Sequence, residues 1–127
     1  MKKLVILCLL LTLSLSASKS SYASGSCTPN YLAYSSVSCT FTGDTNVLEF
    51  YYCNGGTIYQ SLWGSVGAGG TYVYNYITTP NGFIDLAVST GQPDKYASTW
   101  GYNNAGTVIL YTESVGPNNS GGVSASW

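Results

Sequence analysis

The stretch that decides the fold is residues 71–82, TYVYNYITTPNG, in which three tyrosines recur at every second position before a Pro-Asn-Gly turn. Side chains of a β-strand point alternately to the two faces of a sheet, so Tyr72, Tyr74 and Tyr76 form a row on one face. That row is either a wall of the core or an exposed platform, because a register slip of one residue exchanges the two faces.

Two registers are open for the hairpin that this turn closes. A two-residue loop of Asn81 and Gly82 pairs Pro80 with Phe83 and leaves the tyrosine row as an exposed platform. A three-residue loop, with Gly82 in a left-handed conformation, pairs Thr79 with Phe83 and turns the same row into the core.

Turn chemistry and patterning favour the core wall. Pro80 has no N–H to give to a strand ladder, whereas its fixed φ suits the first position of a turn. The exposed register would also place Asn75 among the apolar side chains of the core, where an unpaired amide is costly. We therefore expect Tyr76 to pack opposite Leu86, with the other two tyrosines beside it in the core.

Turn signals recur at short intervals along the rest of the chain, and β-branched and aromatic runs lie between them. Seven strands are expected, near residues 31–42, 47–53, 57–66, 71–79, 83–90, 95–102 and 107–115. Short strands at this spacing predict an all-β fold, either an antiparallel β-sandwich or a small barrel. We assign 24–115 to one such domain and 116–127 to a flexible C-terminal tail whose last residues could add a strand.

The first 23 residues have the order of a secretory signal peptide. Two lysines precede an apolar run over residues 4–15, and a small-residue cleavage site ends at Ala23. We therefore expect a secreted protein, in the extracellular space, at the cell surface or in the periplasm, with no membrane insertion of the mature chain. Asn118 begins an N-glycosylation sequon, which matters only in a cell that glycosylates.

Charge excludes several partners of the mature chain. Loss of residues 1–23 leaves one basic side chain, Lys95, against five acids, a net side-chain charge of −4. The acids are Asp44, Glu49, Asp85, Asp94 and Glu113. Binding to nucleic acid or to anionic lipid needs cations, so neither partner is expected.

The mature cysteines are Cys27, Cys39 and Cys53. A hairpin of 31–42 with 47–53 would place Cys39 opposite Phe50, which leaves Cys53 roughly 10 Å away at the usual strand rise. A disulfide cannot span that distance. We therefore predict that Cys27 pairs with Cys39 or Cys53, and that the remaining thiol is free or intermolecular.

Catalytic and metal chemistry have few residues available. The chain has no histidine, and the part beyond the signal has no arginine, which excludes histidine-dependent nucleophiles and the usual cations of phosphoryl transfer. No motif brings two carboxylates together as glycosidases require, and no zinc or calcium spacing is present. We predict a non-enzymatic protein without a cofactor or a metal.

Two further hairpins bear on the site. A three-residue loop in 95–115 would make Trp100 meet Leu110 and Tyr102 meet Val108 in the core. A three-residue loop in 47–66 would divide that hairpin into an apolar face and an outer patch, although the two-residue Asn-Gly turn at 54–55 is a competing choice. The outer patch comprises Glu49, Tyr51, Tyr59, Ser61 and Trp63.

Aromatic rings beside hydroxyl and carboxylate groups suit the binding of sugars, whose apolar faces stack on rings. We predict a secreted recognition module that binds a glycan or another surface ligand through this patch. The alternative for the patch itself is packing against the second sheet or a loop. The alternative function is a structural subunit of an extracellular filament, coat or matrix, in which the C-terminal segment adds to an open sheet edge of another copy. A secreted toxin is a third interpretation, supported only by size and export.

Overall fold

The computed structural model describes residues 19–21, 28–33 and 36–127. This part of the chain contains no helix, and so no helical membrane span. The strands are β1 (Lys19–Ser21), β2 (Thr28–Ala33), β3 (Ser36–Thr42), β4 (Thr45–Cys53), β5 (Gly56–Ser65), β6 (Tyr72–Thr79), β7 (Gly82–Ser89), β8 (Lys95–Asn103), β9 (Gly106–Val115) and β10 (Ser120–Ser126).

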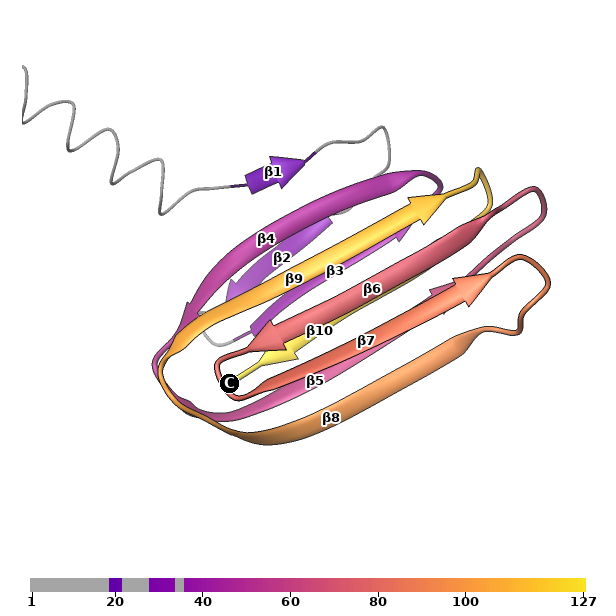
Figure 1. Cartoon of the computed structure of the whole chain (residues 1–127). Helices are drawn as coiled ribbons and strands as arrows, with labels where there is room; N and C mark the ends of the chain where they lie inside the picture. Colours follow the sequence, from indigo (N-terminus) through magenta and orange to yellow (C-terminus); the bar gives the residue numbers. More distant parts are fainter. Residues whose placement is uncertain (1–18, 22–27, 34–35) are drawn as a thin grey trace, which may run out of the picture.

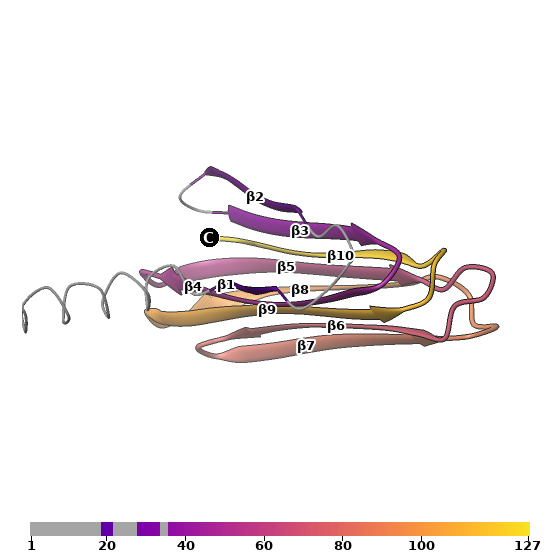
Figure 2. The same cartoon turned by 90° about the horizontal axis from the view of Figure 1, so that it is seen from above.

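The strands form two antiparallel sheets that lie face to face (Figures 1 and 2). Sheet A has the order β1-β4-β9-β6-β7, and sheet B has the order β2-β3-β10-β5-β8. The predicted all-β antiparallel sandwich is confirmed. From β4 to β9, the strands also begin and end close to where turn residues and alternation placed them. The single strand expected over 31–42 is wrong, because β2 and β3 divide that stretch.

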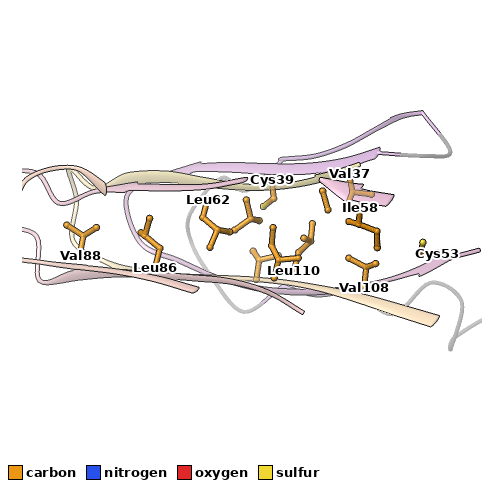
Figure 3. Close-up of a cluster of buried hydrophobic side chains, with 13 residues drawn as sticks. Val37, Cys39, Cys53, Ile58, Leu62, Leu86, Val88, Val108 and Leu110 are labelled. Atoms are coloured by element: carbon orange, nitrogen blue, oxygen red, sulfur yellow. The ribbon is translucent and has the colours of Figure 1, made fainter. Parts of the chain in front are cut away.

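The core is the layer of side chains between the two sheets (Figure 3). Ile58 and Leu62 enter it from sheet B, and Val88, Val108 and Leu110 enter it from sheet A, each at most 1% exposed. These residues alternate with outward side chains along their strands, as half-buried sheets require. The outward positions of both sheets are therefore available for other roles.

Consecutive strands mostly lie in opposite sheets. β3 and β4, β4 and β5, and β8 and β9 each cross from one sheet to the other, so the hairpins expected for these pairs are wrong. Asn54 and Gly55 make the crossing from β4 to β5, and Gly55 and the first residue of β5, Gly56, adopt positive φ of 96° and 123°. β4 pairs instead with β9, and β5 with β8 and β10.

The β6–β7 hairpin has neither of the two registers considered from the sequence. Pro80 and Asn81 form the loop, Thr79 pairs with Gly82, and Tyr76 pairs with Asp85. In this register the side chains of β6 point to the same faces as in the exposed-platform register. The prediction that the tyrosine row is a core wall is therefore wrong, because the row points outward from sheet A.

The buried amide that argued against this face is fully paired. Asn75 is 0% exposed. Its Nδ2 donates to the Trp63 carbonyl at 2.8 Å, and its Oδ1 accepts from the Thr112 hydroxyl at 2.5 Å. An amide with both ends bonded avoids the desolvation cost that excludes an unpaired one.

A second pair of bonds fixes the tip of the hairpin. The Asn81 N–H donates to Asn103 Oδ1 at 2.9 Å, and the Asn104 N–H donates to Asn81 Oδ1 at 2.7 Å. The Pro80-Asn81 turn is thus tied to the connection between β8 and β9. This contact selects a two-residue turn without a left-handed residue at Gly82.

The C-terminal segment is the central strand of sheet B. β10 pairs with β3 along one edge and with β5 along the other. Self-assembly by adding this segment to another copy is therefore not available, since both of its edges are already paired. Its two glycines accommodate rings on opposite faces: a Cβ on Gly121 would stand 2.6 Å from Phe41 Cζ, and one on Gly122 would stand 2.6 Å from Trp63 Nε1.

The turn before β10 is held by Asn119, which is 1% exposed. Its Nδ2 donates to the carbonyls of Val115 and Tyr72, and its Oδ1 accepts from the Gly67 N–H at 3.2 Å. Its own carbonyl accepts from the Gly43 N–H at 2.8 Å. The side chain and carbonyl of one buried residue thus bond three connections, so the turn that was expected to be a flexible tail is closely bonded.

The structure tests part of the predicted disulfide pairing. Cys39 is disulfide-bonded, and Cys53 is a buried free thiol. Of the two partners expected for Cys27, this leaves Cys39. Cys27 lies outside the described residues, so its pairing stays a prediction, as does the signal peptide at 1–23, of which the structure describes only β1.

The Asn75 bonds lead to a test of stability. Substitution of Asn75 by leucine removes one donor from the Trp63 carbonyl and leaves the buried Thr112 hydroxyl without its acceptor, at a cost of about 1–3 kcal/mol for a buried polar group that loses its partner. We expect Asn75→Leu to lower the free energy of unfolding measured in urea. Adding Thr112→Val removes one orphaned group and should restore part of the loss; a double variant no more stable than the single one would contradict this account.

Candidate functional site

The five residues predicted to share a patch do not lie together. Tyr59, Ser61 and Trp63 point outward from sheet B, as expected for a surface site. Glu49 and Tyr51 belong to β4 in sheet A and point inward. The grouping is wrong because β4 and β5 cross between sheets and do not form a hairpin.

Glu49 and Tyr51 form a pair of their own. Glu49 is 3% exposed, and the Tyr51 hydroxyl donates a hydrogen bond to its Oε2. A buried carboxylate needs such a partner. The pair therefore stabilises the interior of the sandwich and takes no part in the outer surface of sheet B.

Two aromatic pairs stand on the outer face of sheet B. Tyr59 lies opposite Trp100 with ring centroids 6.4 Å apart and planes at 29°. Trp63 lies opposite Tyr96 with centroids also 6.4 Å apart and planes at 19°. Tyr59, Trp100 and Tyr96 are 58%, 71% and 77% exposed, which is high for rings of this size.

A shallow groove of about 480 Å³ lies beside one of these pairs. Its lining residues are Tyr59, Gln60, Ser61, Ser98, Thr99, Trp100, Ser124 and Ser126. None of these eight carries a formal charge near neutral pH. The groove therefore offers hydroxyl groups next to aromatic rings, in a volume typical of small-molecule sites.

The central strand supplies one wall of this surface. Ser124 lies opposite Ser61, and Ser126 lies opposite Tyr59. Gly122 lies opposite Trp63 and leaves room for the indole to lie over β10. The pairing of β10 with β5 thus sets both the hydroxyl row and the position of the indole.

Sequence reasoning missed Tyr96, Ser98 and Trp100, and expected Trp100 and Tyr102 in the core. Both are more than 70% exposed. The error came from pairing 95–102 with 107–115 as a hairpin. The strict alternation of Tyr96, Ser98, Trp100 and Tyr102, with a serine among the rings, was the available signal for an outward face.

The outward side chains of sheet A form a second surface, here called the tyrosine face. It comprises Leu48 and Phe50 from β4, Tyr72, Tyr74 and Tyr76 from β6, Phe83 and Asp85 from β7, and Ile109, Tyr111 and Glu113 from β9. Tyr76 stacks on Tyr111 with centroids 4.8 Å apart and also contacts the rings of Tyr74 and Phe83. The row of tyrosines thus lies on the outer face of sheet A, where neighbouring rings leave each of them half-buried.

Two carboxylates hold the phenols of the tyrosine face. Tyr72 donates to Glu113 Oε1 at 2.6 Å and Tyr111 donates to Oε2 at 2.9 Å. The pKa of Tyr72 is raised mainly by its hydrogen bond to Glu113 and secondly by burial. The pKa of Tyr111 is raised more strongly, mainly by burial and secondly by its own hydrogen bond to Glu113. Burial and the nearby Asp85 raise the pKa of Tyr74.

The described residues form no candidate metal site, because no three histidine, cysteine or acidic side chains among them lie close enough together to hold one ion. The groove of sheet B lacks carboxylates, and those of the tyrosine face are bonded to phenols. The chemistry available on both faces is ring contact and hydrogen bonding.

Comparison with known proteins shows no family. No family model matches the chain, and no curated protein matches it either. Among solved structures, TmCBM61 in complex with beta-1,4-galactotriose is 11% identical with a TM-score of 0.42, over 84% of this chain and 82% of that one. The enzymatically active domain of tailspike protein 4 of bacteriophage CBA120 is 10% identical with a TM-score of 0.40, over 84% of this chain and 18% of that one.

The Glu113 bonds predict how stability depends on pH. The phenol of an unfolded chain loses its proton near pH 10, but Tyr72 and Tyr111 keep theirs to higher pH when folded. Their contribution is therefore complete below about pH 10 and is lost as the pH rises above it. We expect the free energy of unfolding to fall above pH 10, and less steeply in Glu113→Gln, while tyrosinate absorbance appears at lower pH in that variant. Equal titration curves for the two proteins would contradict the assignment.

Proposed function

We propose that this protein is a secreted, non-enzymatic recognition module that binds an uncharged glycan along the outer face of sheet B. The observation that carries the proposal is a pair of cross-strand aromatic stacks, one of which borders a serine-lined groove without a charged side chain. Sugar rings present apolar C–H faces that pack on aromatic rings, and their hydroxyls exchange hydrogen bonds with side-chain hydroxyls.

The length of the surface favours an oligosaccharide over a single sugar. Tyr59 and Trp63 are four residues apart on β5, which corresponds to roughly 13 Å at the usual strand rise. The paired hydroxyls of Ser61 and Ser98 lie between the two stacks. A ligand that extends along the strands would contact both stacks and the hydroxyls between them.

The lack of charge favours a neutral ligand and binding without catalysis. An acidic glycan would need cations, and Lys95, whose Nζ donates to the Ala87 carbonyl at 2.7 Å, is directed to β7. Hydrolysis of a glycosidic bond needs carboxyl groups beside the ligand, and none lines the groove. The remaining interactions suit recognition.

Removal of one ring tests the proposal. We expect Trp100→Ala to weaken binding to a neutral β-linked polysaccharide by roughly thirtyfold, the effect of an interfacial aromatic anchor worth about 2 kcal/mol. Phe83→Ala removes an exposed ring from the opposite sheet and is the matched control. Affinity electrophoresis against β-glucan, galactan, xylan, mannan and polygalacturonate measures the effect. Unchanged retention of both variants, or preference for polygalacturonate, would overturn the proposal.

A second test moves an aromatic ring without removing it. The Cβ of Gly122→Ala would stand 2.6 Å from Trp63 Nε1 and 3.2 Å from the Cys39 carbonyl, so the indole must shift. We expect altered tryptophan fluorescence and at least about fivefold weaker binding, since ligand contacts depend on exact ring placement. Gly101→Ala on β8 is the control, because its Cβ meets nothing within 4 Å. Equal affinities of the two variants would show that the Trp63 position does not matter.

A further inference from the structure

The tyrosine face is unlike the groove of sheet B, because it combines an apolar half with an acidic half. In the apolar half, Phe50, Ile109 and Phe83 lie in one row that crosses the sheet through Thr78. Phe50 and Phe83 are 46% and 58% exposed. Exposed rings on the outer face of a sheet are typical of the centre of a protein interface, where phenylalanine and tyrosine are enriched.

The acidic half carries charge without a cationic partner among the described side chains. Glu113 and Asp85 accept hydrogen bonds from tyrosine hydroxyls, which leave their negative charge in place. Beyond the expected signal peptide the chain has one basic side chain, Lys95, which donates to the Ala87 carbonyl and to Gln92. The electron-rich faces of Tyr74, Tyr76 and Tyr111 add to the attraction for a cation.

Charge also decides against a second copy as the occupant. Two tyrosine faces in contact would oppose carboxylate to carboxylate, and the one lysine beyond the expected signal, Lys95, is bonded to Ala87 and Gln92. Like charges brought together at an interface cost several kcal/mol. A complementary partner must bring basic groups of its own beside an apolar side chain.

We propose that the tyrosine face docks a protein partner that presents arginine or lysine next to an apolar residue. Apolar side chains of the partner pack along the row from Phe50 through Ile109 to Phe83, and the basic group lies over the tyrosine rings and pairs with Glu113. Arginine fits best, because its planar guanidinium both stacks on aromatic rings and bonds to a carboxylate. The protein would then join a glycan on one sheet to a basic protein on the other.

Peptides of defined charge test this docking. The probes are an end-capped hexapeptide that alternates leucine with arginine and a matched one that alternates leucine with glutamate, each added to the full mature chain labelled for NMR. We expect only the arginine peptide to shift amide resonances of β6, β7 and β9. Glu113→Gln should weaken its binding about tenfold, as loss of a charge pair at an interface does. Phe83→Ser should weaken it similarly through the apolar half.

Asp94→Asn is the control for general charge, because it removes one exposed acid outside the tyrosine face. An equal loss of affinity in Asp94→Asn and Glu113→Gln would overturn the proposal in favour of nonspecific attraction. Shifts of the same resonances that depend on protein concentration alone would assign the face to a second copy. Shifts of these resonances caused by a neutral oligosaccharide in place of the peptide would assign the tyrosine face to glycan. All of these outcomes are measured on sheet A, so they can be told apart from failure of the glycan site on sheet B.

Discussion

The amide of Asn75, held between the Trp63 carbonyl and the Thr112 hydroxyl, sets the orientation of β6 and with it the chemistry of both outer faces. Once this polar group is satisfied inside, the three tyrosines of the same strand must point to solvent. The bond to Trp63 also joins sheet A to the strand that displays two of the exposed rings of sheet B. One internal amide thus links the two candidate surfaces.

The strands were predictable from the sequence because their signals are local: turn residues end each strand, and alternation marks its faces. Pairing was not predictable in the same way. The partners of Asn75 lie 12 and 37 residues away, and no rule of turn chemistry contains them. Tyr59, Ser61 and Trp63 were correctly placed on one face because a single strand holds them, whereas Glu49 and Tyr51 were misplaced because their relation to β5 depends on the crossing between sheets.

The chain has few charged side chains, and three of them have distinct structural roles. Glu49 is internal and bonded to Tyr51, and Glu113 orders two phenols. Lys95 reaches from β8 at the edge of sheet B to the Ala87 carbonyl on β7 at the edge of sheet A. Lysine at a sheet edge discourages further strands from pairing there. The open side of the sandwich is thereby protected without a covering loop.

The position of β10 has a consequence for how the protein is made. Of the described strands, β10 comes last along the chain, yet sheet B has no centre without it, and Ser124 and Ser126 complete one wall of the groove. Pairings between such distant segments form slowly, since long loops must close first. A chain from which β10 is missing therefore has no complete groove, and a ligand of the groove would distinguish chains that have paired β10 from those that have not.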